Sequence, residues 1–347
     1  MDKTATHPTT LQKLLGVLMG ITLLLSLFCL AACNSDNDTD SSNSSITIKK
    51  QGATSEIDHN VSIEQTTLID IPEASITADS ISFQNDSLKL ALNMTNKISK
   101  PISIQAGTLG FSANYINNYM VNDGYIGIDL EPNESKTAEV VFNSQELKML
   151  GINQIGEIGI GITIKNNQTS KDYSTINFDQ IHREIVSIKT SQYNSVDMNV
   201  DTYPDAITSE SLLNTLNATL LKFSKEEGFD QNGIKIKSLG LFKNTDDEIS
   251  VLLEIQNSTN TLVGVQASDV IINGEMAYEG TWIGSAIAPD KIAIMSICLN
   301  DIINLANNNE AVQSIDLSNI TTVGIELAAL DVNSNTVVSP TELEFTF

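Results

Sequence analysis

Hydrophobic residues alternate with polar or small residues along several stretches of the chain. Residues 88–94 read Leu-Lys-Leu-Ala-Leu-Asn-Met, residues 158–164 read Ile-Gly-Ile-Gly-Ile-Thr-Ile, and residues 249–255 follow a similar pattern. A period of two sends successive side chains to opposite faces of a strand, so these stretches predict half-buried β-strands. Turn signals such as Asn122-Asp-Gly124 and Ile272-Asn-Gly274 separate them. The pattern predicts an all-β chain.

Helical patterns are few. Asn143 followed by Glu146 is typical of an N-cap with its partner at N3, and Gly151 marks the end of the short helix that they open. Residues 205–221 are a longer helical candidate. Short strands at regular spacing with so few helices favour β-sandwiches.

The second half of the chain repeats the pattern of the first. Residues 86–96 align without gaps on residues 247–257, and Asn96 and Asn257 are identical. The alignment returns where Tyr125-Ile-Gly127 matches Trp282-Ile-Gly284. Pro132 then matches Pro289, and after a two-residue gap Lys136 matches Lys291. Residues 155–162 finally match residues 320–327. Because order and apolar phase hold over about a hundred residues, the sequence predicts an internal duplication, and with it two independent folding units.

The N-terminal segment has the pattern of a secretory signal. Only Lys3 and Lys13 are basic ahead of an uncharged apolar run, residues 14–30, and small residues then lead into Cys33. The run is also long enough for an uncleaved transmembrane helix. Cleavage is favoured because residues 34–45 are all Asn, Ser, Asp or Thr, with no basic flank after the run.

The ending Leu30-Ala-Ala-Cys33 resembles the lipobox of bacterial lipoproteins. That resemblance implies that Cys33 receives a diacylglyceryl group through its sulfur and becomes the first mature residue. It also implies a protein on the outer side of the cell membrane, anchored to the membrane through lipid on Cys33.

The net charge and the cysteine content exclude some partners and disulfide bonds. The formal net charge is −24, so the chain is repelled by nucleic acid and by anionic headgroups, and we expect no nucleic-acid partner. Cys29 leaves with the signal and Cys33 is the lipid site, so only Cys298 remains and no intramolecular disulfide forms. Cys298 follows an apolar strand and is expected to be a buried, inert thiol.

Each copy resembles an immunoglobulin-like domain common in extracytoplasmic proteins of Gram-positive bacteria. The first copy carries the motifs at 90–96, Pro132–Lys136 and 155–164; the second carries them at 232–236, Val270–Gly274 and Pro289-Asp-Lys291. The first copy has Ala113-Asn114 where the pattern has an Asn-Gly turn. The resemblance implies two tandem immunoglobulin-like β-sandwiches with no catalytic residue.

These observations divide the chain into five parts. We predict a signal peptide at 1–32, a disordered tether at 33–60, a first sandwich at 61–190, a linker with room for a short helix at 191–222, and a second sandwich at 223–347.

Residues with catalytic or metal-binding chemistry are scarce. His59 and His182 lie far apart in sequence and are expected to face solvent. Residues 197–201, Asp-Met-Asn-Val-Asp, have the spacing of a calcium loop, but Thr202 and Thr208 stand where Gly and Glu belong. We therefore expect a strand with its acidic side in water there, no metal and no cofactor.

Aromatic residues are the best binding candidates. Corresponding loops of the two copies hold Tyr115, Tyr119 and Tyr125, and Met276, Tyr278 and Trp282. Exposed, they would contact a sugar or a protein partner; buried, they would plug the ends of the two cores. Trp282 matches Tyr125 in the duplicated frame, so we expect it to be largely buried.

The sequence thus predicts a lipid-anchored, extracytoplasmic protein that is not an enzyme and acts as an interaction or spacer module for an unknown protein or glycan partner. The alternative is a carbohydrate-binding surface protein that uses the aromatic loops. A hydrolase is disfavoured because the sequence has no evident nucleophile–base set.

Overall fold

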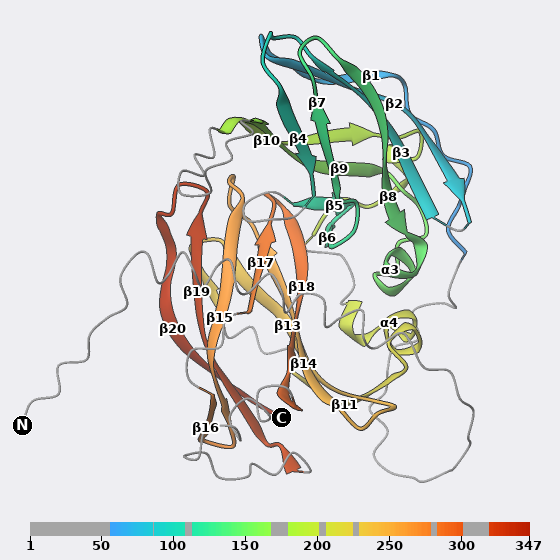
Figure 1. The fold of residues 1–347 in the computed structure, drawn as a ribbon. Helices are drawn as coiled ribbons and strands as arrows, with labels where there is room; N and C mark the ends of the chain where they lie inside the picture. The colour runs from blue at the N-terminus through green and yellow to red at the C-terminus, as the bar shows by residue number, and fades with distance from the viewer. Residues whose placement is uncertain are drawn as a thin grey trace, which may run out of the picture.

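The computed structural model describes residues 56–85, 87–107, 113–167, 180–200, 206–224, 229–278, 283–300 and 319–347. The signal segment, Cys33 and most of the predicted tether lie outside these ranges, as do Trp282 and the side chains of 276–278. The described chain forms two β-sandwiches, one above the other in Figure 1, so the predicted all-β sandwich class is confirmed.

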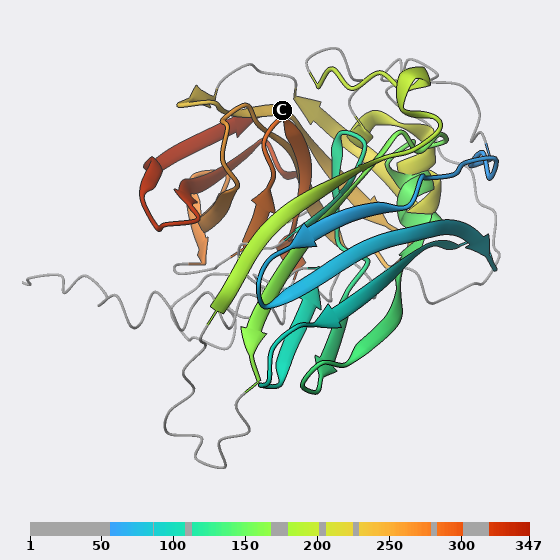
Figure 2. The same cartoon turned by 90° about the horizontal axis from the view of Figure 1, so that it is seen from above.

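The first sandwich packs two sheets against each other (Figure 2). One has the order β1 (Thr66–Asp70), β2 (Ala74–Gln84), β3 (Ser87–Asn96) and β8 (Ser135–Asn143). The other contains β7 (Ile126–Leu130), β4 (Ile102–Ala106), β9 (Glu157–Asn166), β10 (Gln180–Lys189) and a hairpin of β5 (Asn114–Ile116) and β6 (Tyr119–Val121). The inward residues of β3 are buried in the core between the sheets, as the alternation predicts.

Helix α3 (Ser144–Met149) follows β8. The Asn143 side chain accepts a hydrogen bond from the backbone N–H of Gln145 at 2.8 Å, and Gly151 has φ +70°, a left-handed conformation that suits glycine after a helix. The predicted start and end of this helix are confirmed.

The second sandwich repeats the arrangement. One sheet has the order β11 (Ala218–Ser224), β13 (Ile234–Asn244), β14 (Ile249–Asn257) and β18 (Lys291–Cys298), with β12 (Asp230–Gln231) beside β13. The other has β15 (Val263–Ile272), β16 (Glu275–Tyr278), β17 (Ile283–Ile287), β19 (Thr322–Asp331) and β20 (Thr336–Thr346).

Strand registers agree with the duplication seen in the sequence. Ala106 of β4 lies opposite Ile126 of β7 and Ile162 of β9. The aligned Ala267 of β15 lies opposite the aligned residues of β17 and β19. The two copies therefore share strand order and residue-by-residue pairing in this sheet.

A buried asparagine makes the same contacts in both copies. The Asn96 amide donates to the backbone carbonyls of Lys100 and Leu130 at 2.8 and 3.2 Å. Asn257 donates to the equivalent carbonyls, at 2.8 Å each. Each Asn ties the end of its strand to the loop that leads into the next sheet, which explains why it is identical in both copies.

One detail of the predicted alignment is wrong. Asn257 lies opposite Lys291 in the sheet, whereas Asn96 donates its backbone N–H to the carbonyl of Glu134 at 2.9 Å. Glu134, and not Lys136, is therefore equivalent to Lys291, and no gap is needed between the copies here.

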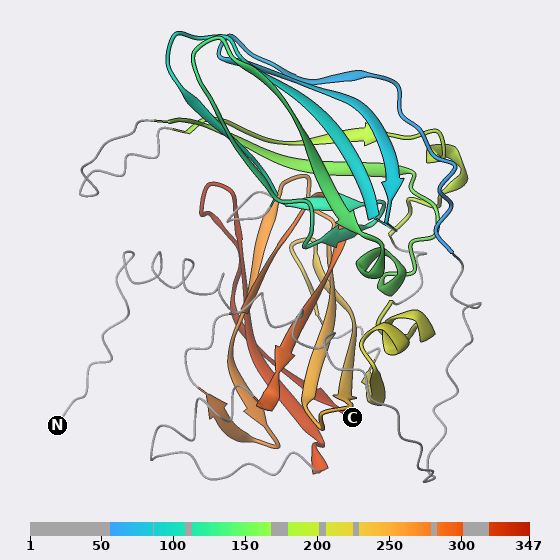
Figure 3. The ribbon, with the colours of Figure 1, turned by 45° about the vertical axis from the view of Figure 1, so that its right-hand side comes forward.

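A continuous sheet joins the two copies. The path β11-β13-β14-β18-β6-β5-β9-β4-β7 runs from the second copy into the first, and the crossing is a parallel pairing of Ile292 with Tyr119. Helices α3 and α4 (Glu210–Thr215) are neighbours, with α4 below α3 in Figure 3. We call the region where the two copies meet the junction. The first copy contributes β5, β6 and the start of β9 to it, and the second copy contributes β14 and the start of β18, with the linker beside them.

Two predicted boundaries need correction. Residues 56–60 belong to the folded first copy, because Ile57 is buried and the N–H of Asp58 donates to the carbonyl of Asn153 at 2.8 Å. The second sandwich begins before residue 223, since β11 starts at Ala218 and pairs with β13. The linker does hold a short helix, α4, together with the 3-10 turns Tyr193–Ser195 and Ala206–Thr208.

The linker also changes how β14 is buried. Ile207, Leu212 and Leu216 of the linker pack on Phe242 and Leu252, which lie on the outer face of the second copy. The alternation predicts that this face meets water. It is covered instead by the segment between the copies, so β14 is buried on both faces.

Candidate functional site at the junction of the two copies

The structure buries two of the three described aromatic candidates. Tyr115 and Tyr119 are 6% and 0% exposed, in strands β5 and β6, whereas Tyr125 is 56% exposed. The interpretation of Tyr115 and Tyr119 as ligand contacts is therefore wrong, because both rings are covered at the junction. The side chains of Met276 and Tyr278, and Trp282 as a whole, lie outside the described part of the chain.

Glu254 is the polar centre of the junction. It lies on β14, is 0% exposed, and its Oε1 accepts hydrogen bonds from the Tyr119 hydroxyl at 2.9 Å and the Ala206 N–H at 2.8 Å. Its Oε2 accepts one from the Ser238 hydroxyl at 2.7 Å. A buried carboxyl is tolerated when donors surround it. These donors come from the first copy, the linker and the second copy.

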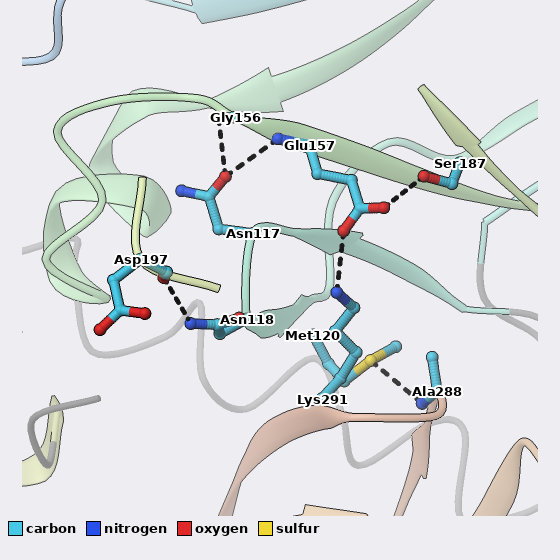
Figure 4. A network of polar contacts seen from close by, with 9 residues as sticks. All are labelled: Asn117, Asn118, Met120, Gly156, Glu157, Ser187, Asp197, Ala288 and Lys291. Atoms are coloured by element: carbon cyan, nitrogen blue, oxygen red, sulfur yellow. Dashed lines mark hydrogen bonds and ion pairs between the residues drawn. The ribbon is translucent and has the colours of Figure 1, made fainter. Parts of the chain in front are cut away.

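An ion pair between Lys291 and Glu157 also joins the two copies at the junction (Figure 4). The Lys291 ammonium of β18 lies 2.9 Å from Glu157 Oε2 of β9, with side-chain exposures of 10% and 14%. The Ser187 hydroxyl donates to the same carboxylate. Lys291 Nζ also lies 4.2 Å from the centre of the Tyr115 ring, within reach of a cation–π contact. Burial raises the pKa of Tyr115, and the negative charge of Glu157 adds to the rise, so the ring stays neutral.

The turn between β5 and β6 corresponds to an Asn-Gly turn in the second copy. The Asn117 side-chain oxygen accepts from the N–H groups of Gly156 and Glu157 at 2.8 and 3.1 Å. In the second copy, Asn273 accepts from the backbone of Thr321 and its neighbour at 2.7 and 3.1 Å. Both Asn residues have positive φ, 53° and 51°.

This equivalence corrects the sequence alignment. Asn273-Gly274 of the second copy corresponds to Asn117-Asn118 of the first copy, and not to Ala113-Asn114. The adjacent Asn118 donates its amide to the carbonyl of Asp197 at 3.0 Å and accepts the N–H of Ile292 at 2.8 Å through its own carbonyl. The first copy therefore uses its turn both to close its own sheet and to contact the second copy. Figure 4 shows the side-chain hydrogen bonds of Asn117 to Gly156 and Glu157 and of Asn118 to Asp197.

Other candidates from the sequence do not gather into a site. His59 stacks on Phe83 with ring centres 4.0 Å apart, and His182 lies 3.1 Å from Glu184 on the partly exposed strand β10. Within the described ranges, no group of three or more His, Cys, Asp or Glu side chains lies close enough to hold a metal ion. No described helix is long and apolar enough to cross a membrane.

Two local predictions also need correction. The described part of the calcium-like segment, residues 197–200, is irregular rather than a strand, with the Asn199 N–H donating to the Asp197 side chain at 2.9 Å. Asp201 and Thr202 lie outside the described residues, and Thr208 ends a 3-10 turn. Cys298 is partly exposed and not buried, because it lies at the end of β18.

A small apolar hollow lies beside the linker. A cavity of about 20 Å3 is lined by apolar side chains that include Leu216, Phe242 and Leu252. This volume accommodates about one water molecule, and a sugar ring does not fit.

Comparison with known proteins adds no function. No protein-family model and no curated protein matches the chain. Among solved structures, it is similar to a bacterial ice-binding adhesin, with 10% identity, a TM-score of 0.17 and coverage of 75% of this chain and 56% of that chain. It is also similar to a GH2 beta-galacturonidase from Eisenbergiella tayi, with 8% identity, a TM-score of 0.19 and coverage of 86% and 45%. The chain spans about half the length of these two structures, and similarity this weak supports no argument about activity.

Sequence reasoning missed the junction. Glu254 and Glu157 stand at polar positions of alternating strands, where solvent exposure is the default expectation, and their partners lie 135 and 134 residues away. The sequence carries no signal for the ion pair, because the sequence alignment pairs Lys291 with Lys136. The equivalence of Lys291 with the acidic Glu134 emerges only from strand pairing.

Proposed function

We propose that this protein is a non-catalytic module on the outer side of the cell membrane, anchored by lipid on Cys33, in which two immunoglobulin-like sandwiches act as one rigid body. The observation that carries the proposal is the junction. Strand pairing, a buried carboxyl with donors from three segments, and a mostly buried ion pair all hold the copies in one orientation. A fixed orientation suits a protein that spaces or presents a binding surface.

The entry point of the chain bears on how the body would be presented. Glu56, the first described residue, pairs with Lys148 of α3 at 3.4 Å, beside the junction. A tether that joins the body there holds it near its middle, so both outer ends of the pair of sandwiches stay free for partners.

Carbohydrate binding has weaker support. Of the three aromatic candidates with described side chains, only Tyr125 is exposed, and a single ring offers one stacking surface. We therefore retain the interaction or spacer role.

Replacement of the lipid-bearing thiol tests the anchoring. We expect Cys33→Ser to move the protein from the membrane fraction to the soluble extracytoplasmic fraction, because the sulfur that would carry the lipid is gone. Cys298→Ser is the matched control, since it removes the other mature thiol and should leave the protein in membranes. Retention of Cys33→Ser in membranes would support an uncleaved transmembrane anchor instead.

A further inference from the structure

The carboxylate of Glu146 has an unusual environment for an acidic side chain. It is in the first turn of α3, and its Oε1 accepts a hydrogen bond from the N–H of Asn122 at 2.8 Å. Its Oε2 is closed off from solvent, and no described residue donates a hydrogen bond to it. A buried carboxylate oxygen without a donor strongly disfavours the charged form.

The loop above Glu146 is fixed at several points. The Asp123 side chain accepts from the N–H of Asn143 at 2.8 Å, and the carbonyls of Asp123 and Gly124 accept from the buried Asn114 amide at 2.8 and 3.1 Å. Gly124 has φ +86°, and a Cβ there would meet Phe142 at 2.7 Å. The 122–124 loop therefore packs closely against β8 and the start of α3.

Among the described residues, no positively charged side chain acts on the Glu146 carboxyl. Asp123 is the charged group that acts on it from the loop, and its negative charge opposes ionisation. The 56–65 segment contributes Glu56, which pairs with Lys148 of α3 at 3.4 Å, and α4 contributes the acidic Glu210 in its first turn. Burial raises the pKa of Glu146 to about 7, and the charge of Asp123 adds to this rise. Hydrogen bonds from the backbone N–H groups of Asn122 and Asp123 oppose it.

We infer that Glu146 is a proton-binding residue whose charge controls how firmly the 122–124 loop is held against α3. In the neutral form the carboxyl fits its site. In the ionised form it carries a buried charge beside Asp123, and opening of the loop, which hydrates that charge, becomes more favourable. The loop directly follows β6, whose Tyr119 contacts Glu254 of the second copy, so opening acts next to the junction.

The direction of the pH effect follows from linkage. The pKa of Glu146 is higher in the closed loop than the ordinary value of 4.5, so the closed state holds a proton that the open state releases. Opening therefore becomes more favourable as pH rises from about 5 to 7, by up to about tenfold per pH unit for one proton. Above about pH 7 the carboxyl is ionised in both states, and the effect levels off.

Amide hydrogen exchange at Asn122 and Asp123, whose N–H groups donate to Glu146, tests this inference in the whole folded protein. After correction for intrinsic exchange rates, the opening equilibrium of these amides should rise with pH in the wild type and be flat in Glu146→Gln. Glu275→Gln, the same substitution at an exposed position of β16, is the matched control and should retain the wild-type slope. Equal slopes in wild type and Glu146→Gln would overturn the inference.

Direct titration keeps the inference falsifiable if Glu146→Gln fails to fold. The carboxyl carbon of Glu146, followed by NMR in the wild type, should titrate near neutral pH, and a midpoint near 4.5 would contradict the inference. Both experiments are repeated with EDTA and with added calcium. A calcium-dependent loss of opening would overturn the proton assignment in favour of a bound cation.

Discussion

At the residue scale, four asparagines define the repeated unit, and three of them, Asn96, Asn117 and Asn257, are buried. Asn96 and Asn257 tie strand ends to the opposite sheet, and Asn117 and Asn273 close the hairpin turns. The first pair is identical in a gapless alignment and could be found from the sequence. The second pair could not, because Asn117 is followed by Asn and not Gly, and its role depends on N–H groups from a strand some forty residues away.

We predict that Asn117→Ala lowers the free energy of unfolding by about 1–3 kcal/mol. The substitution leaves the N–H groups of residues 156 and 157 without an acceptor. Asn133→Ala is the matched control: its φ of 57° is close to the 53° of Asn117, but it lies in an exposed turn. Both variants lose an Asn at positive φ, so the difference between them in denaturant unfolding measures the side-chain hydrogen bonds. Equal losses would show that the turn conformation, and not its contacts, is what matters.

At the scale of elements, the sequence predicts the strands well and their environment less well. The period of two identifies β3, β9 and β14, and the capping residues identify α3. The outer face of β14 is different, because the linker and β6 cover polar positions that an alternating strand normally exposes. Burial of those positions depends on contacts between segments more than a hundred residues apart, such as Tyr119 and Glu254.

We predict that Tyr119→Phe weakens the contact between β6 and the second copy. The substitution keeps the ring and removes one of the donors to the buried Glu254 carboxyl, which costs about 1–3 kcal/mol of unfolding free energy. Tyr125→Phe removes the same hydroxyl from an exposed ring and should change stability by less than about 0.5 kcal/mol. A Tyr119→Phe variant as stable as Tyr125→Phe would mean that Glu254 is satisfied without the first copy.

At the scale of the whole molecule, the copies are joined more closely than the duplication alone predicts. The sequence favours two independent units, and a fragment of residues 223–347 tests that prediction. Such a fragment cuts β11 and removes Tyr119 and Ala206, both of which donate to Glu254. The sequence contains each of these residues but no sign of their proximity, because strand pairing between copies leaves no periodic pattern.

If the two sandwiches form one rigid body, the distance between a point on one and a point on the other is constant. Spin labels placed on both sandwiches measure that distance. Spin labels at Asp129 of β7 and Glu342 of β20, exposed positions on different copies, are introduced into the mature chain with Cys33 and Cys298 replaced by Ser. Pulsed electron–electron double resonance should give a single narrow distance distribution, no wider than the labels themselves produce. A broad distribution, or one with several distances, would show that the copies move relative to each other and are not one rigid body.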